Sequence, residues 1–466
     1  TLGPASSTKE IMLELVKAGA DVFRINFSHA DYELVKRNVD IIREINQEYG
    51  YNISILGDLQ GPKLRVGVVK EGSFLNPGDV LTFTNEPCEG DSTKVFMTYE
   101  KFPQDVKVGE RILIDDGKLV FEVIETNQKD TVKAKTIQGG PLSSKKGVNL
   151  PNTNVSLPAL TEKDIEDAKF MIENEFDWIA LSFVRHAQDI IDLKKLIQAH
   201  SDFKIPIIAK IEKPEGVKNI DEILLECDGL MVARGDLGVE VPMEEVPVIQ
   251  KKLVDKARYY SKPVIIATQM METMISSLTP TRAEVNDVAN NVLDGADAVM
   301  LSGETSVGKY PVDVVKNITK IIKNIESTNL YEKKNDIIEK ITCVDDRFVT
   351  DMVCLNAVKI AETTGAAAII TLTHSGYTAF QISAHRPTSR IIVYSSNRRV
   401  LTMLNLVWGV RAFYYDMNKS TDETVIQVNM LTHHYGYVEK GDFVVNLNAM
   451  PVYEGGKTNT LRLTNI

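Results

Sequence analysis

Short apolar runs alternate with amphipathic stretches along the chain from Gly19 to about Pro311. Helical spacing of apolar residues lies between most of these runs, for example over Thr161–Glu173. This rhythm is typical of a parallel sheet covered by helices. The seven runs predicted to be strands are Asp21–Phe27, Ile53–Leu59, Trp178–Phe183, Ile205–Ile211, Gly229–Ala233, Pro263–Thr268 and Ala296–Leu301. With a stub at Thr1–Leu2 to close the circle, they predict an α/β fold, the eight-stranded (β/α)8 or TIM barrel.

The rhythm is interrupted once, between the second and third predicted strands. Asp58 and Ser182 are 124 positions apart, compared with intervals of about 30 between the later strand ends. Within this interval, Gly, Pro, Asp and Asn turns separate short alternating strands such as Val80–Thr84. We expect a small β-barrel domain inserted in a barrel loop. Because such loops carry the active sites of barrel enzymes, a hinged lid is its expected role.

Three domains are therefore predicted. The barrel would comprise residues 1–65 and 158–328, and the inserted lid domain residues 66–157. A C-terminal α/β domain, regulatory or interfacial, would comprise residues 329–466, with the charged segment at 332–340 as a linker.

Charge and cysteine content exclude several classes of protein. The net charge is −11, whereas proteins that bind nucleic acid or anionic membranes usually present positive charge. The four cysteines have no C-x-x-C spacing, so we expect free thiols in a reducing compartment, the cytoplasm. The longest apolar stretches, such as Ala366–Leu372, are too short to cross a bilayer.

Polar side chains occur at the ends of the predicted strands. Because side chains alternate along a strand, Arg24, Asn26 and Ser28 point to one side, as do Lys210 and Glu212. Six more polar residues lie at or just past the end of an apolar run: Asp58, Ser182, Asp236, Thr268, Ser302 and Glu304. Strand ends converge on the face where barrel enzymes carry their active sites. Any single member could be a solvated loop start or a helix cap, but the whole set predicts a site.

Glu212 and Asp236 are candidate metal ligands. Two carboxylates with open coordination positions suit Mg²⁺ or Mn²⁺ bound together with a substrate phosphate. The alternative is that these carboxylates form ordinary salt bridges with their neighbours Lys213 and Arg234.

Lys210 and Arg24 supply positive charge beside the two carboxylates. Cations here would stabilise a phosphoryl group in transfer, because charge spreads over its oxygens. Lys210 could instead form a Schiff base, as in a barrel lyase or aldolase, since buried lysines lose their proton readily. The adjacent carboxylate favours the charged ammonium, and we therefore prefer the electrostatic role.

Eight motifs, in order along the chain, resemble those of pyruvate kinases. They are TLGPAS at 1–6, RINFSH at 24–29, KKGVNLP at 145–151, IAKIE at 208–212, VARGDLG at 232–238, ATQMME at 267–272, PTRAE at 280–284 and MLSGET at 300–305. The resemblance extends over essentially the whole chain. It implies an enzyme that transfers the phosphoryl group of phosphoenolpyruvate to ADP and protonates the enolate to pyruvate, the last step of glycolysis.

The resemblance also implies roles for the residues at the strand ends. Lys210, aided by Arg24, would stabilise the phosphoryl group, and Glu212 and Asp236 would hold Mg²⁺ or Mn²⁺. The substrate would be bound by Arg24, Ser182, Lys210, Ala233, Gly235, Asp236 and Thr268. Protonation of the enolate would involve water and the side chains of Thr268, Ser302 and Glu304.

Four residues resemble the nucleotide-phosphate contacts of the family: Asn26, His29, Arg65 and Lys146. Lys146 lies on the inserted domain, so closure of the lid would complete the site and exclude water. The resemblance further implies a homotetramer with the C-terminal units at one interface.

The chain departs from many pyruvate kinases at residues 58–63. Many members read DTKGPE here and require K⁺, whereas this chain reads DLQGPK. The K⁺ site would be built from Asn26, Ser28, Asp58 and the carbonyl of Leu59. Because the ammonium of Lys63 can supply the same positive charge, as in the lysine variants of the family, we predict that Mg²⁺ is required and K⁺ is not. The alternative is a neutral surface lysine.

A hydroxyl-rich loop in the C-terminal unit resembles the place where many pyruvate kinases hold the phosphate of an allosteric sugar. Its candidate effector residues are Thr371, Thr373, Ser375, Gly376 and Thr378, just before a helical stretch. The segment at 451–457 carries Glu454 where a basic residue would help. The pattern therefore does not favour fructose 1,6-bisphosphate; a monophosphate effector, or none, remains open.

Two other functions are weighed against this one. A lyase or aldolase would use Lys210 as a Schiff base, against which the paired metal carboxylates argue. A catalytically inactive relative would bind phosphorylated metabolites as a sensor, but every catalytic position that we can place carries a competent residue.

Overall fold

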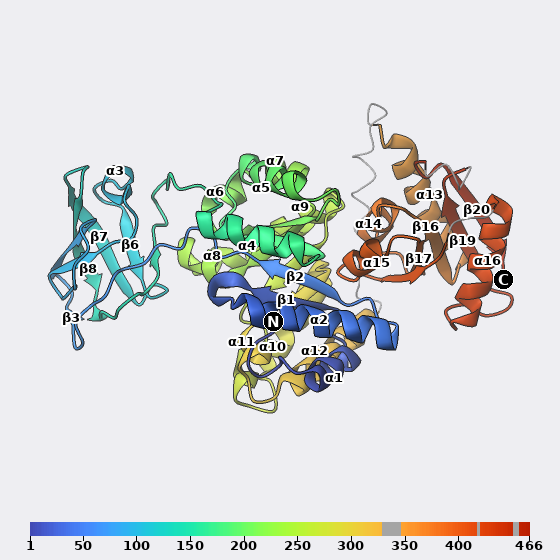
Figure 1. Ribbon diagram of the computed structural model, residues 1–466, viewed down its shortest axis with the longest axis horizontal. Helices are drawn as coiled ribbons and strands as arrows, with labels where there is room; N and C mark the ends of the chain where they lie inside the picture. Colours follow the sequence, from blue (N-terminus) through green and yellow to red (C-terminus); the bar gives the residue numbers. More distant parts are fainter. Residues whose placement is uncertain (329–345, 417–419, 451–455) are drawn as a thin grey trace.

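Three bodies lie in a row in the computed structural model (Figure 1): a β domain, a central barrel wrapped in helices, and an α/β domain that contains the C-terminus. The structure describes residues 1–328, 346–416, 420–450 and 456–466, except for the side chains of His29 and Thr421. The predicted domain limits stay predictions. The predicted linker at 332–340 and the start of the third domain at 329 lie outside the described residues.

The central barrel is a curled sheet of parallel strands. Its order is β1 (Val22–Asn26), β2 (Ser54–Asp58), β11 (Trp178–Leu181), β12 (Ile207–Ile211), β13 (Gly229–Ala233), β14 (Val264–Ala267) and β15 (Ala298–Met300). The stub at Thr1–Leu2 fills the remaining gap. The Leu2 N–H donates to the Arg24 carbonyl at 2.9 Å, and the Thr1 hydroxyl donates to the Leu301 carbonyl at 2.6 Å. The predicted (β/α)8 barrel is thereby confirmed.

Alternate residues of these strands belong to two separate apolar clusters. Leu56, Trp178 and Ile208 share one cluster, whereas neighbours such as Ile55 and Ile179 pack with the surrounding helices. Strands buried on both faces read as continuous apolar runs, which is why the sequence marks them so clearly.

Helices form the outer layer of the barrel. They are α1 (Lys9–Ala18), α2 (Tyr32–Tyr49), α4 (Glu162–Glu173), α5 (Ala187–His200), α6 (Pro214–Lys218), α7 (Ile220–Glu226), α8 (Arg234–Glu240), α9 (Val246–Tyr259), α10 (Arg282–Asp294), α11 (Gly303–Ser306) and α12 (Pro311–Glu326). Local sequence sets several of their ends. Thr161 and Thr281 form capping boxes at the starts of α4 and α10, and Gly295 ends α10 with a φ of 101°. Gly57 allows α4 to approach β2, because a Cβ there would lie 2.4 Å from the Met171 sulfur.

The inserted segment forms a mostly antiparallel β structure around an apolar core. Its largest sheet has the order β10 (Val148–Asn149), β6 (Arg111–Ile114), β7 (Leu119–Thr126), β8 (Thr131–Gln138), β4 (Val80–Thr84) and β5 (Lys94–Phe96), in which β4 and β5 pair in parallel. Strands β3 (Phe74–Leu75) and β9 (Gly140–Pro141) pair separately, and α3 spans Phe102–Asp105. Phe83 packs edge-on against both Phe102 and Phe121. The small domain thus has a core of its own.

The C-terminal domain is built on an open α/β sheet. Its strand order is β18 (Val410–Tyr414), β17 (Arg390–Ser395), β16 (Ala368–Leu372), β19 (Phe443–Asn448) and β20 (Thr460–Asn465), of which β20 alone in this sheet is antiparallel to its neighbour. The helices are α13 (Phe348–Thr364), α14 (Tyr377–Ala384), α15 (Arg398–Leu404) and α16 (Thr421–His434). Among the described residues, no helix combines the length and the apolar character that crossing a membrane requires.

The C-terminal domain packs against the amino ends of the barrel strands. Trp178, the first residue of β11, donates its indole N–H to the Met403 carbonyl at 3.0 Å. Asp297, just before β15, pairs with Arg386 at 3.0 Å, and the two side chains are 5% and 1% exposed. Arg386 also donates to the Gly295 carbonyl at 2.7 Å. One apolar cluster runs from the barrel interior into the C-terminal domain, so the two bodies share a core.

The buried Arg386–Asp297 pair supplies a test of this junction. The variant R386M leaves the Asp297 carboxylate buried without its cation, and we expect it to lower the free energy of unfolding by about 3 kcal/mol. The double variant R386M/D297N should recover part of this loss. Chemical denaturation measures both. The matched control K133M breaks an exposed pair with Glu125 and should cost under about 1 kcal/mol. A denaturation midpoint of R386M equal to that of the wild type would contradict the expectation.

Candidate active site

Charged side chains from three barrel elements meet at the carboxyl end of the barrel. The Lys210 Nζ on β12 lies 3.0 Å from Asp58 Oδ1 on β2 and 3.1 Å from Glu212 Oε1, just after β12. Arg24 on β1 donates from Nε to Asp58 Oδ2 at 2.7 Å. Lys210 also donates to the Ser182 hydroxyl at 2.6 Å. Five of the residues predicted from the strand ends are thus in direct contact.

The charge states of this cluster follow from its contacts. Burial would lower the pKa of Lys210, but the charges of Asp58 and Glu212 outweigh burial, and the pKa is raised above its ordinary value. Burial would raise the pKa of Asp58, but Lys210 and Arg24 hold it below its ordinary value. Lys210 is therefore an ammonium at neutral pH. An ammonium cannot attack a carbonyl carbon, which favours the electrostatic role over the Schiff base.

Glu212 and Asp236 fit a divalent cation. Burial raises the pKa of Glu212; Lys210 opposes this shift, and the Asp236 carboxylate adds to it. A cation between the two carboxylates would relieve this repulsion, and oxygen ligands suit Mg²⁺ or Mn²⁺. Within the described ranges, no group of three or more His, Cys, Asp or Glu side chains is arranged to hold a metal ion. Two carboxylates alone fill only part of the coordination of such a cation, which leaves positions for substrate oxygens and water.

The alternative interpretation, in which these carboxylates form salt bridges with Lys213 and Arg234, is wrong. The Lys213 Nζ lies 2.7 Å from Glu240, and Arg234 lies 2.7 Å from Asp287. Both neighbouring cations are thus directed to other partners.

Thr268 and Gly235, which follow the ends of β14 and β13, contact each other. The Thr268 hydroxyl accepts the Gly235 N–H at 2.8 Å and donates to the Ala267 carbonyl at 2.6 Å. A Cβ at Gly235 would lie 3.2 Å from that hydroxyl, so the glycine permits this approach. Thr268 has a φ of 69°, which is strained for a β-branched residue. Strain of this kind at a strand end is typical of a functional position.

Glu304 connects the loops that follow β14 and β15. Its two carboxylate oxygens accept the N–H groups of Met271 at 3.1 Å and Ser302 at 2.7 Å, and the side chain is buried. The contacts show a residue that positions both loops. Its predicted part in protonation, with Ser302, stays a prediction.

In the described part of the structure, no set of contacts joins the residues predicted to bind the nucleotide into one cluster. Asn26 is exposed, and its Oδ1 accepts the Ser28 N–H at 3.0 Å. The Lys146 Nζ lies 3.0 Å from Asp115 Oδ1, inside the inserted domain. Arg65 donates to the Lys145 carbonyl at 3.1 Å.

The fourth predicted nucleotide contact, His29, belongs to a 3-10 turn over Phe27–His29. Its side chain lies outside the described part of the structure. The nucleotide roles stay predictions.

The residues of the predicted monovalent-cation site already have partners. The Leu59 carbonyl accepts the Ser182 hydroxyl at 2.7 Å, and both Asp58 oxygens face cations. Lys63 is exposed, and its Cε lies 3.6 Å from the place of a Cβ on Gly147 in the inserted domain. Independence of K⁺ stays a prediction.

The candidate effector residues lie together at the carboxyl end of β16. Thr371 donates to the Thr378 hydroxyl at 3.1 Å, and the Gly376 N–H donates to the Thr373 hydroxyl at 2.9 Å. Ser375 is exposed. Residues 451–455 of the second predicted effector segment lie outside the described residues. The effector stays a prediction.

Two contacts between the inserted domain and the barrel were not predicted. The Asn149 amide on β10 donates to Glu240 Oε1 at 2.8 Å, and the same oxygen accepts from Lys213 at 2.7 Å. Arg185, after β11, donates to the carbonyls of Val155 and Leu157 in the segment that returns from the inserted domain. Asn149 and Glu240 are 91 residues apart, and no periodicity marks such a pair.

Comparison with known proteins now places the chain in a family. A family model described as "Pyruvate kinase, barrel domain" matches residues 1–315, and one described as "Pyruvate kinase, alpha/beta domain" matches residues 351–464. The chain belongs to the pyruvate kinase family. It is therefore a phosphotransferase, and the family resemblance noted in the sequence is confirmed.

Curated relatives and a solved structure agree with this assignment. A pyruvate kinase of Mycobacterium intracellulare is 41% identical over 100% of this chain and 97% of the relative. One of Geobacillus stearothermophilus is 42% identical over 99% of this chain and 79% of the relative. The crystal structure of a pyruvate kinase from Cryptosporidium parvum has a TM-score of 0.94 at 33% identity, covering 100% of this chain and 94% of that one. The lyase or aldolase alternative is thereby excluded.

The Asn149–Glu240 contact predicts a positioning role for Asn149 in turnover. The variant N149A removes the amide that attaches β10 to α8, and we expect kcat/KM of the pyruvate kinase reaction to fall about tenfold, because a hydrogen bond to a buried charge is lost. The matched control is N152A, since Asn152 contacts Arg111 inside the inserted domain; it should retain wild-type kinetics. Equal kinetics of N149A and N152A would disprove the role.

Proposed function

We propose that this pyruvate kinase family member catalyses Mg²⁺-dependent transfer of the phosphoryl group from phosphoenolpyruvate to ADP, without a need for K⁺. The observation that carries the proposal is the Lys210 ammonium, held within 3.1 Å of Asp58 and Glu212 at the carboxyl end of the barrel. A fixed cation at this place needs little reorganisation when charge develops on a transferring group.

Lys210 and Arg24 would share the charge of the phosphoryl group. Asp58 contacts both cations, at 3.0 Å and 2.7 Å, and thereby fixes the distance between them. Such positioning supports transfer, because the protein contributes mainly geometry and charge to this reaction.

Glu212 and Asp236 would hold the divalent cation. When bound, Mg²⁺ would neutralise charge on the substrate oxygens and orient them. The Phe183 N–H donates to Glu212 Oε2 at 2.7 Å, which fixes the direction of this carboxylate. Asp236 lies in the first turn of α8, two residues from the backbone at Ala233–Arg234 that leads out of β13.

The substrate carboxylate would lie against the Gly235 backbone and Thr268. Absence of a side chain at Gly235 permits close approach, and Ser182 would complete the pocket from β11. After transfer, the enolate would take its proton through the Thr268 hydroxyl and water, with Ser302 nearby. Glu304 accepts the backbone N–H groups of Met271 and Ser302 and would thereby hold the two loops in position relative to each other.

The nucleotide would bind between the barrel and the inserted domain, near Asn26, His29, Arg65 and Lys146. Lys63, beside Gly147, would bring its ammonium to this junction. The homotetramer, the phosphorylated effector at Thr371–Thr378 and the cytoplasmic location belong to the same proposal.

The first experiment measures pyruvate formation from phosphoenolpyruvate and ADP with Mg²⁺. The variant K210Q keeps a polar side chain but removes the charge, and kcat should fall at least about a hundredfold. The control is K252M, which changes an exposed lysine on α9. Circular dichroism checks that K210Q is folded. Substantial turnover by folded K210Q would contradict the role of Lys210, and no turnover by the wild type would contradict the proposed reaction.

The second experiment tests K⁺ independence. The wild type should turn over fully in a K⁺-free buffer, whereas K63E, which removes the local cation and adds an anion, should need added K⁺. K101E, at an exposed lysine of the inserted domain, serves as the control for charge reversal. If the wild type works only after K⁺ is added, the Lys63 hypothesis is wrong.

A further inference from the structure

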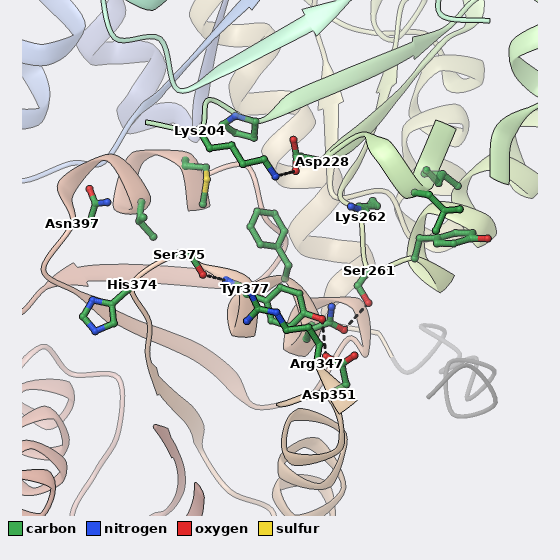
Figure 2. Close-up of a pocket in the computed structure, with 18 of the residues that line it drawn as sticks. Lys204, Asp228, Ser261, Lys262, Arg347, Asp351, His374, Ser375, Tyr377 and Asn397 are labelled. Carbon is green, nitrogen blue, oxygen red and sulfur yellow. Dashed lines mark hydrogen bonds and ion pairs between the residues drawn. The ribbon is translucent and has the colours of Figure 1, made fainter. Parts of the chain in front are cut away.

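A cavity of about 640 Å³ lies between the barrel and the C-terminal domain, away from the candidate active site. Figure 2 shows its lining. On the barrel side it is lined by residues that precede β12, β13 and β14, among them Lys204, Asp228 and Lys262. The opposite wall comes from the loop after β16, the start of α14 and the loop after β17. Its volume is in the range of small-molecule sites.

Aromatic rings line both sides of the cavity. Phe203 and Tyr260 come from the barrel, and Tyr377 and Phe380 come from α14. Arg399 lies over one face of Phe203, 4.2 Å from the ring centroid, and Arg347 over one face of Tyr377, at 4.6 Å. The remaining ring surfaces can pack against a flat apolar ligand. The position of the C-terminal wall is favourable too, because ligands of open α/β sheets bind at the carboxyl ends of the strands.

Two of the three carboxylates that line the cavity, Asp228 and Asp351, already have partners. Asp228 pairs with Lys204 at 2.9 Å and accepts the Ile207 N–H at 3.1 Å. Asp351 accepts the Tyr377 hydroxyl at 2.8 Å. The third carboxylate, Asp202, is exposed. These carboxylates therefore do not favour the binding of a cationic ligand.

Hydrogen-bond donors, by contrast, remain available. Lys262 forms no ion pair within 4 Å in the ranges that the structure describes. Asn397 uses its Oδ1 to accept the Arg399 N–H at 3.0 Å, which leaves its amide N–H groups for another partner. Ser375 is exposed on the opposite wall, and Figure 2 shows it across the cavity from Lys262. His385 adds no charge, because burial and the nearby Arg258 lower its pKa to about 4.

We propose that this cavity is a binding site for a small organic anion that carries an aromatic ring. The carboxylate or phosphate of the ligand pairs with Lys262, and the ring lies between the aromatic walls of the two domains. The site does not depend on the proposed reaction, although its lining includes Ser375, a residue of the proposed effector loop. Because the ligand would touch both bodies, its binding stabilises their junction.

Binding of three matched probes tests the proposal: 1-naphthyl phosphate, 1-naphthylacetate and the neutral 1-naphthol. Isothermal titration calorimetry on the full chain, without substrates, gives each Kd. At least one of the acids should bind about tenfold more tightly than 1-naphthol, because a charge-assisted hydrogen bond is added. The preference between the two acids identifies the head group as phosphate or carboxylate.

Two variants locate the binding. K262M keeps the aliphatic stem of the lysine and should weaken the preferred acid about tenfold, whereas K252M, on an exposed face of α9, should not. S375W adds bulk to the cavity without removing a packed side chain and should abolish binding. Equal affinity of the acids and 1-naphthol, or unchanged binding in both K262M and S375W, would overturn the proposal. Turnover with phosphoenolpyruvate and ADP is measured in parallel, and its outcome tests the proposed reaction and not the binding site.

Discussion

A buried ammonium between two carboxylates is the interaction on which the catalytic end of this protein depends. Lys210, Asp58 and Glu212 could not stay charged in a barrel interior alone, because burial of a single charge is costly. Together, and with Arg24, they offset one another, as the opposed pKa shifts of Lys210 and Asp58 show. They come from three strands: Arg24 from β1, Asp58 from β2, and Lys210 and Glu212 from β12 and the position directly after it. The cluster is therefore complete only when the strands of the barrel are in register.

The other end of the same strands has a different construction. There the barrel interior continues into the apolar core of the C-terminal domain, and the buried Asp297–Arg386 pair lies across the boundary. Strands β12 to β14 thus have the candidate active site at one end and the domain junction with its cavity at the other. A change at the junction acts on elements that also carry Lys210 and Thr268.

The sequence was sufficient for the fold and for the centre of the site, because both depend on patterns within short segments. Strand periodicity predicted the barrel, and the polar residue after each apolar run predicted the cluster around Lys210. Strand ends were less exact: Ile205 and Pro206 precede β12, since a proline cannot donate to the sheet. Pairings between distant segments, such as Asn149 with Glu240, left no such pattern. The cavity was missed for the same reason, because it exists only where two domains meet.

Closure of the barrel by Thr1–Leu2 has a consequence for the order of events during synthesis. The Thr1 hydroxyl bonds to the carbonyl of Leu301, 300 positions later in the chain. At a translation rate of about 5–20 residues per second, the last gap in the barrel stays open for about 15–60 s after its first edge has been made. During that time the outer edge of the Thr1–Leu2 stub lacks its partner at Leu301, and the nascent chain is exposed to wrong associations that the finished enzyme avoids.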